Sequence, residues 1–305
     1  MLRQLSSIEH EHKLHQLRRR RYQNTGIWVT KTDQFRRWDE SNTSSCLWCY
    51  GIRCALTFSL LNKLTFCSWL WEDHFIVSAH VLLSAYGSLT DRCHRTAVID
   101  SLRNVSNTPT ASTSRCHTVH FFCNYADPIT LSAAEIFGSL AKQLLTALGQ
   151  IPEEIEKKIS KAYGDGTLIP DGTTVWHILV DIINLFKRVY IILDGVDECK
   201  GEDRREIISA IQSLYRTAVA TGIVKIFVAS RADVDIEKAL QTSITLSVDS
   251  SSITSDIELV IRGKVEEKSL SGELFVRDRR LLDEIIGTLT EKADGMYETP
   301  FRLPR

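Results

Sequence analysis

Apolar residues along this chain form two kinds of pattern, short apolar runs and longer amphipathic stretches. The short runs are rich in β-branched, aromatic and cysteine residues and predict strands at 44–50, 117–123, 189–193, 224–229 and 243–248. Amphipathic segments separate them and predict helices. Strands that alternate with helices indicate a mostly parallel sheet with helices on both faces. The pattern therefore predicts an α/β fold built on a five-stranded sheet.

The amphipathic stretches have apolar residues three and four positions apart. They predict helices at 31–40, 97–105, 132–148, 152–162, 174–187, 203–221, 254–268 and 277–293, after a polar helical segment at 3–24. Ser132 begins the third of these helices and Glu135 follows three residues later, which is the pattern of a capping box. We therefore expect Ser132 to cap that helix and Glu135 to complete the box.

The chain divides into three parts by pattern. We expect a helical segment at 1–43, a core at 44–250 and a helical segment at 251–305. Residues 52–96 interrupt the core and follow neither periodicity. Two apolar stretches inside them approach the length of a membrane span, but Asn62 and Lys63 break the first, and the second is short. A membrane anchor is thus an alternative that the pattern does not favour.

The amino-acid composition identifies no catalytic chemistry, but it argues against some classes of protein and of site. The net charge is −1, and hydrophobic and charged residues make up 43% and 25% of the chain, so a globular protein without general affinity for nucleic acid is expected. The basic run 18–21 is interpreted as a solvated helix face rather than a phosphate-binding patch or a nuclear address. Eight cysteines without disulfide spacing favour reduced thiols and a cytoplasmic location. Cys46 and Cys49 are interpreted as buried strand residues rather than metal ligands.

One strand carries the candidate chemistry. The apolar run 189–193 ends in Asp194-Gly195-Val196-Asp197-Glu198, so carboxylates follow a buried strand at the edge where ligands bind in parallel sheets. Asp194 would hold Mg²⁺, which prefers oxygen ligands shared with substrate phosphates. Asp197 or Glu198 would orient or deprotonate an attacking water. The alternative is that Asp194-Gly195 forms an ordinary turn without a role in binding or catalysis.

A second predicted strand also ends in polar residues that could bind a nucleotide. Residues 224–229 are followed directly by Ser230 and Arg231. A polar side chain and an arginine at the end of a neighbouring strand could contact a terminal phosphate and stabilise its charge. Ser230 and Arg231 are therefore candidate nucleotide-binding residues, with a solvated strand end as the alternative.

The phosphate-binding half of such a site is missing from the sequence. None of the 15 glycines begins G-x-x-x-x-G-K-[ST], whose backbone amides and lysine cradle phosphates. The Gly263-Lys264 pair is followed by Val265 and has Glu258 where the first glycine should be. Loss of three or four charged hydrogen bonds would weaken nucleotide binding by roughly 5 kcal/mol or more. We therefore expect poor ATP binding and negligible hydrolysis.

Together these segments resemble the fungal NACHT-type signal-transduction NTPases, close to the nephrocystin-3-like N-terminal domain. The resemblance covers residues from about 10 to 51 and from about 97 to 297. The segments that carry it are Lys13-Leu14, Thr25-Gly26-Ile27-Trp28, Phe35-Arg36-Arg37-Trp38, Leu47-Trp48-Cys49-Tyr50-Gly51, His120-Phe121-Phe122-Cys123-Asn124-Tyr125-Ala126-Asp127-Pro128, Ile136 to Leu144, Asp194 to Glu198 and Ala229-Ser230-Arg231.

The resemblance implies a P-loop NTPase-like fold that works as an ATP- and Mg²⁺-gated oligomerisation switch. It implies Asp194 as the Mg²⁺ residue, Asp197 and Glu198 as the catalytic acidic pair, and Arg231 as the sensor. It also implies a nucleotide as ligand and a homo-oligomer as assembly. The net charge of −1 indicates no specific nucleic acid as partner, and the broken apolar stretches do not favour a membrane.

Two stretches depart from the family pattern. Residues 52–96 stand where the family's phosphate loop should follow the strand that ends at Gly51, and 298–305 depart from it before the expected winged-helix and repeat regions. The alternatives are therefore a nucleotide-independent scaffold or interaction module, and a gene model in which a retained intron or a frame error replaces the loop.

Overall fold

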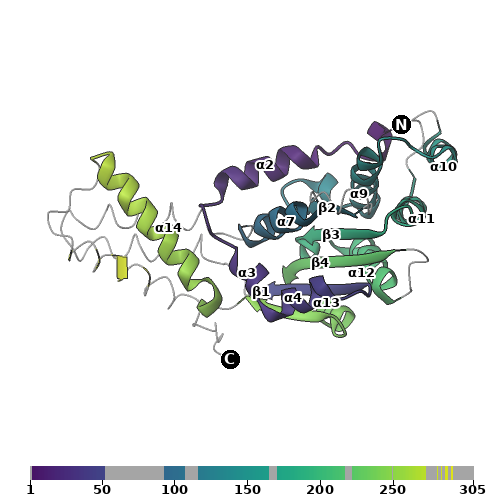
Figure 1. Cartoon of the computed structure of the whole chain (residues 1–305). Helices are drawn as coiled ribbons and strands as arrows, with labels where there is room; N and C mark the ends of the chain where they lie inside the picture. Colours follow the sequence, from purple (N-terminus) through teal and green to yellow (C-terminus); the bar gives the residue numbers. More distant parts are fainter. Residues whose placement is uncertain are drawn as a thin grey trace, which may run out of the picture. The chain divides into compact units, whose positions relative to one another are not determined.

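The fold is built on one parallel sheet. A computed structural model describes residues 2–51, 93–106, 116–164, 170–216, 222–248 and 250–272, with single helical residues between 280 and 290. The strand order is β2-β3-β4-β1-β5, and β1–β4, β2–β3 and β3–β4 pair in parallel (Figure 1). The predicted five-stranded α/β fold is confirmed. The strands are β1 (Ser45–Gly51), β2 (Cys116–Phe122), β3 (Arg188–Asp194), β4 (Ile223–Arg231) and β5 (Ile244–Val248).

Most helices lie close to where the apolar periodicity predicts them, but the helix between β4 and β5 was not predicted. In the described residues they are α1 (Leu2–Leu5), α2 (His10–Arg20), α3 (Trp28–Lys31), α4 (Asp33–Glu40), α7 (Cys93–Ser106), α9 (Ala133–Leu148), α10 (Glu153–Tyr163), α11 (Gly172–Ile183), α12 (Gly201–Arg216), α13 (Val234–Leu240) and α14 (Ser250–Leu270), with 3-10 turns η1 (Pro128–Leu131) and η2 (Val196–Glu198).

The structure differs from the predicted helices at the N-terminus, and parts of two other predicted segments are not described. The single helical segment expected at 3–24 is wrong, because residues 6–9 separate α1 from α2. The interrupting segment 52–96 and the helix expected at 277–293 lie almost entirely outside the described residues. Among the helices that the structure describes, none combines the length and the apolar character needed to cross a membrane.

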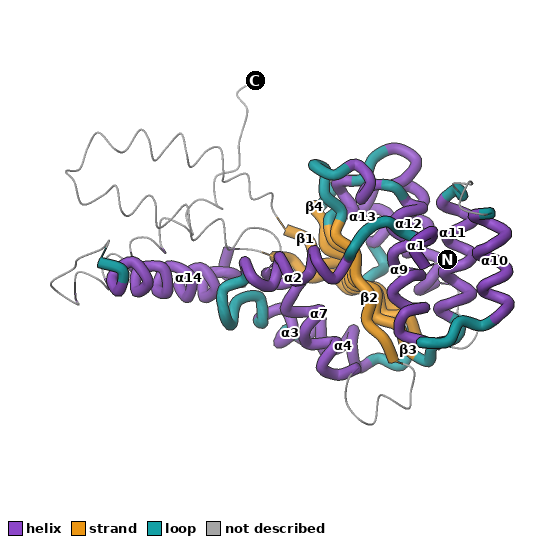
Figure 2. Tube along the Cα trace, turned by 90° about the horizontal axis from the view of Figure 1, so that it is seen from above, coloured by secondary structure: helices purple, strands orange, loops and turns teal. Residues whose placement is uncertain are grey.

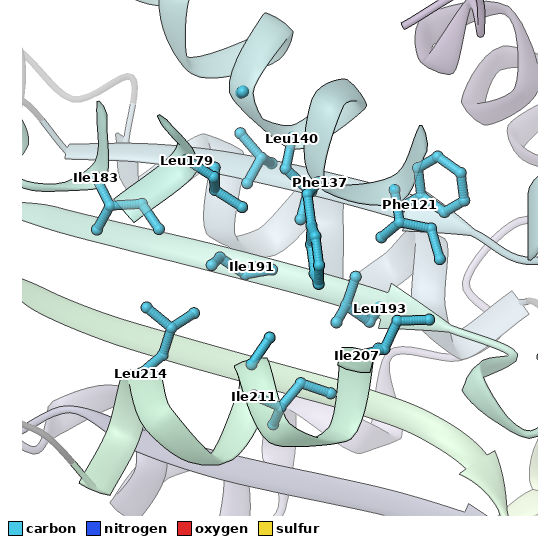
Figure 3. Packing of buried hydrophobic residues seen from close by; sticks show 14 of the residues in the cluster. Phe121, Phe137, Leu140, Leu179, Ile183, Ile191, Leu193, Ile207, Ile211 and Leu214 are labelled. Carbon is cyan, nitrogen blue, oxygen red and sulfur yellow. The ribbon is translucent and has the colours of Figure 1, made fainter. Parts of the chain in front are cut away.

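Helices cover both faces of the sheet, as predicted (Figure 2). One face carries α9, α11 and α12, and the other carries α4 and α7. In a strand, successive side chains point to opposite faces, so Ile191 and Leu193 pack with Phe137, Ile207 and others on the first face (Figure 3). The opposite face receives Trp38, which is fully buried and stacks edge-on against the rings of Tyr190 and Phe227.

A buried polar network holds α4 at the amino ends of the strands. The Lys225 amine donates to the Trp38 carbonyl at 2.6 Å, to Ser45 Oγ at 3.1 Å and to Ser41 Oγ. Lys225 is fully buried, and burial, followed by the charge of Arg188, lowers its pKa to about 8. The strand spacing gave no signal of this contact, because Lys225 lies in an otherwise apolar run.

The expected capping box at the start of α9 is wrong. Ser132 makes no side-chain cap bond, and the Ala133 amide donates instead to Asp203 Oδ1 at 2.8 Å. Glu135 Oε1 accepts hydrogen bonds from Ser6 Oγ at 2.7 Å and from the Ser7 amide at 2.8 Å. Tertiary partners from distant segments therefore replace the local partners that the spacing suggested.

The N-terminal residues pack tightly on α9. Leu5 is buried, and the Lys142 amine donates to the Ser6 carbonyl at 2.9 Å. A Cβ at Gly138 would lie only 1.8 Å from the Leu5 carbonyl oxygen. Glycine at 138 is therefore what allows α1 to approach the helix this closely.

By contacts the chain forms two compact units. The first comprises 1–15, 29–51 and 97–247, and therefore contains four strands, most of β5 and the helices around them. The second comprises 16–28, 52–96 and 248–305. Within it the Gly26 amide donates to Asp256 Oδ2 at 2.7 Å, and Tyr22 packs against Gly263 of α14. Trp28, at the end of the segment 25–28, is half-buried.

We expect Gly138→Ala to lower the free energy of unfolding by about 1–3 kcal/mol, because the new methyl group collides with backbone that cannot move aside cheaply. On an isolated helix the same change would stabilise by up to about 1 kcal/mol, so the sign is informative. Urea unfolding measures it, with Thr146→Ala on the exposed face of α9 as control. A Gly138→Ala protein as stable as the wild type would contradict the packing of α1 described above.

Lys225→Met should change how stability depends on pH. The pKa of Lys225 falls from its ordinary 10.5 to about 8 on folding, so between these values the unfolded chain binds more protons than the folded chain. Stability contributed by this group therefore rises as pH rises from about 8 to 10.5. Urea unfolding across that range should show this rise in the wild type and a smaller rise in Lys225→Met. Parallel curves would show that Lys225 ionises normally.

Candidate functional site

The candidate site lies at the carboxyl edge of the sheet. Parallel pairing places Asp194 opposite Ala229 on β4, and Ala229 opposite Cys49 on β1. On its other side Asp194 pairs with Phe122, the last residue of β2. Four strands therefore end within a few residues of Asp194, and the segments that follow them converge there.

The turn after Asp194 depends on a glycine. Asp194 is fully buried, and its carbonyl accepts the Cys123 amide at 2.8 Å. Gly195 adopts a left-handed conformation with φ of 76° and donates its amide to the Ala229 carbonyl at 2.9 Å. A Cβ at this position would lie 3.1 Å from the Cys123 carbonyl oxygen. The turn is thus pinned to the ends of both neighbouring strands.

Asp197 and Arg231 form the central ion pair of the site. Asp197 lies in η2, and its Oδ1 accepts the Arg231 backbone amide at 3.1 Å. Its Oδ2 accepts the Arg231 Nε–H. The Asp197 side chain is only 5% exposed, whereas that of Arg231 is 33% exposed. The structure therefore brings together two residues that the sequence assigned to different roles, one catalytic and one phosphate-sensing.

The charge on Arg231 is strongly favoured. Burial alone would disfavour the guanidinium, but the hydrogen bond and charge of Asp197, with Asp233 and Glu198 nearby, outweigh it and raise the pKa of Arg231. An arginine in this environment is a permanent cation at the sheet edge.

Glu198 is held by the segment after β2. Its Oε2 accepts a short hydrogen bond from the backbone amide of Tyr125, a residue whose side chain is largely exposed. The sequence linked Glu198 only to the strand before it. Its contact with the segment after β2 follows from the strand order, which places β2 beside β3.

The Ser230 hydroxyl makes hydrogen bonds within the protein. The Trp48 indole Nε1 donates to Ser230 Oγ at 2.9 Å, and Ser230 Oγ donates to the Arg231 carbonyl at 3.0 Å. Ser230 is buried. Its hydroxyl joins the end of β1 to the end of β4, and its proposed contact with phosphate stays a prediction.

Arg204, near the start of α12, is a site residue that the sequence did not reveal. Its Nε donates to the Cys199 carbonyl at 2.6 Å, and its Nη2 donates to the Asp197 carbonyl. Its Nη1 contacts Asp233 Oδ2 and Asp235 Oδ2, each at 3.1 Å. One half-buried guanidinium therefore ties the turn after β3 to the loop after β4. An arginine near the start of an amphipathic helix has no sequence signature for such a role.

The cysteines near the site are free thiols. Cys123 and Cys199 are buried with their sulfur atoms 3.7 Å apart. Cys46 and Cys49 are also buried, as expected, but residues three apart on a strand point to opposite faces. They cannot share a metal ion. Within the ranges described, no group of three or more His, Cys, Asp or Glu side chains could hold a metal by itself.

Comparisons with known proteins give one match. Residues 94–231 match the family described as Nephrocystin 3, N-terminal, a range that runs from α7 to the end of β4. This range contains Asp194, Asp197, Glu198, Ser230 and Arg231, and the match supports a nephrocystin-3-like domain in this chain. No curated protein and no solved structure matches the chain.

Gly195→Ala should destabilise the fold by about 1–2 kcal/mol, because a left-handed conformation is costly for alanine and the new methyl group presses on the Cys123 carbonyl. Gly201→Ala is the matched control. Its φ is also positive, at 60°, but an added Cβ meets nothing within 4 Å. Thermal unfolding of both proteins should show the larger loss at 195. Equal losses would mean that the close approach to Cys123 does not matter.

Proposed function

We propose that this chain is a nucleotide-binding signalling module whose ligand, ATP with Mg²⁺, sits at the carboxyl edge of the sheet. The observation that carries the proposal is the convergence of a buried carboxylate, Asp194, with a second acid, Glu198, and a cation, Arg231, at the ends of adjacent parallel strands. Open parallel sheets bind ligands at that edge. The match to the nephrocystin 3 N-terminal family lends coarse support.

The donor set suits Mg²⁺ that arrives with its nucleotide. Asp194 supplies a carboxylate, and the described residues offer no complete cluster of ligand side chains. Mg²⁺ commonly keeps several waters and binds through one or two carboxylates plus substrate phosphates. The bound ion would neutralise charge on the phosphates. Asp194 would hold it in place, directly or through water.

The remaining residues would act on the phosphates and on water. Arg231 would contact the terminal phosphate, because a guanidinium donates paired hydrogen bonds to phosphate oxygens. Glu198 would orient or deprotonate the attacking water, with its Oε2 already held by the Tyr125 amide. Asp197 is the other member of the acidic pair that the family resemblance implies. The cysteines without disulfide spacing support a cytoplasmic location, and the resemblance to NACHT-type switches supports homo-oligomers.

A specific observation supports a second candidate function. The sequence contains no G-x-x-x-x-G-K-[ST], and the fold reproduces the rest of the sheet edge without it. A nucleotide-independent scaffold or interaction module would use the same fold with Asp197 and Arg231 as a structural ion pair. Sequencing the native transcript across codons 45–105 separates a lost loop from a misread gene.

We expect weak binding of Mg·ATP, with a dissociation constant in the high-micromolar to millimolar range, because the backbone amides and lysine of a phosphate loop are missing. Asp194→Asn should remove the part of this affinity that depends on Mg²⁺, while Asp127→Asn, an equal charge change at an exposed loop residue, should not. Isothermal titration with and without Mg²⁺ measures both. A low-micromolar constant would overturn the expected weakness, and no binding at millimolar ATP would favour the scaffold.

A further inference from the structure

We propose that Asp197 is a positioning residue that aims Arg231 at a polyphosphate, and that Glu198 alone of the acidic pair faces water. The inference rests on the proposed function only for the identity of the ligand as a phosphate anion. Its geometry rests on the contacts between η2, α12 and the end of β4.

Asp197 holds Arg231 at two points. One carboxylate oxygen takes the Arg231 backbone amide at 3.1 Å, and the other takes the Nε–H of the same residue. Two contacts on one side chain fix both the strand end and the direction of the guanidinium. The two terminal NH₂ groups of Arg231 have no hydrogen-bond partner among the described residues, and a third of the side chain is exposed. The free edge of the guanidinium therefore points away from Asp197.

The position of Asp197 is also fixed through its backbone. The Arg204 guanidinium binds its backbone carbonyl and that of Cys199. Arg204 is itself only 15% exposed and is paired with Asp233 and Asp235. The carboxylate of Asp197 is thus fixed by its own backbone as well as by its partner.

The same contacts argue against Asp197 as a general base. A base needs a free lone pair within reach of a water molecule. Each carboxylate oxygen of Asp197 accepts a hydrogen bond from Arg231, and the side chain is only 5% exposed, so water has little access to the lone pairs that remain. Glu198 is different, because only its Oε2 accepts a hydrogen bond within the described part of the chain, and it is less buried.

The exposed edge of Arg231 fits one class of ligand. Two parallel N–H groups of a guanidinium match two oxygens of a phosphoryl group, whereas a lysine would offer only a point charge. Since one edge of the fork is already held, less side-chain freedom is lost when an anion binds the other edge.

The test measures binding of inorganic tripolyphosphate to the full chain by isothermal titration. Removing a negative charge next to a cation should by itself strengthen anion binding, so Asp197→Asn separates positioning from simple electrostatics. We expect Asp197→Asn to weaken binding by about three- to tenfold, and Arg231→Lys to weaken it by about tenfold. Glu237→Gln, an equal charge change at an exposed residue of α13 outside these contacts, should leave binding unchanged or slightly stronger.

Wild-type NMR keeps the test decisive if Asp197→Asn does not fold. In protein labelled with ¹⁵N-arginine, the Arg231 Nε–H signal, assigned by its loss in Arg231→Lys, should stay protected from exchange when tripolyphosphate binds. Loss of that protection on binding would show that Asp197 competes with the anion, and would overturn the proposal. Tighter binding by Asp197→Asn, equal effects of Asp197→Asn and Glu237→Gln, or no binding by the wild type would overturn it as well.

Failure of this inference is distinguishable from failure of the proposed function. If tripolyphosphate binding depends on Asp197 and Arg231 but adenosine and Mg²⁺ add no affinity, the nucleotide function fails and the positioning role stands. If Mg·ATP binds in a manner that needs Asp194 but not Asp197 or Arg231, the nucleotide function stands and the positioning role fails.

Discussion

The hydrogen-bonded register between β3 and β4 places the acidic turn beside the end of β4, and the rest of the site follows from it. Asp194 pairs with Ala229, so the next residue, Gly195, can donate its amide to the Ala229 carbonyl. That bond turns the chain into η2 and brings Asp197 against Arg231. A shift of one residue would reverse the faces of every side chain on the strand, and the ion pair would be lost.

Buried charge at both edges of the sheet shows how the fold compensates for polar groups in a dense core. At the carboxyl edge Asp197 meets Arg231, and Arg204 caps two carbonyls. At the amino edge Lys225 is surrounded by one carbonyl and two hydroxyls. A buried charge without such partners would cost several kcal/mol, so each network also specifies which segments must pack there. These networks tie α4, α12 and the strand ends into one unit.

The acidic half of the site is thus supported by the fold itself and does not depend on a phosphate loop for its geometry. Arg204 of α12, Trp48 of β1 and the Tyr125 amide after β2 bind Asp197, Ser230 and Glu198, respectively. This explains how a sheet edge of this kind can keep its arrangement in a chain whose sequence lacks G-x-x-x-x-G-K-[ST]. It also means that a preserved ion pair at this edge is compatible with either a nucleotide switch or a scaffold.

The sequence by itself determined the strands, most helices, the parallel α/β architecture and the location of Asp194 through Glu198 at a strand end, because periodicity and apolar runs are local properties of the chain. Only the tertiary structure decided which polar groups meet. Glu135 does not complete the predicted capping box but binds Ser6 and Ser7, and Asp197 binds Arg231. These pairings join residues 34 or more positions apart, and strand order and register, which no local pattern encodes, bring them together.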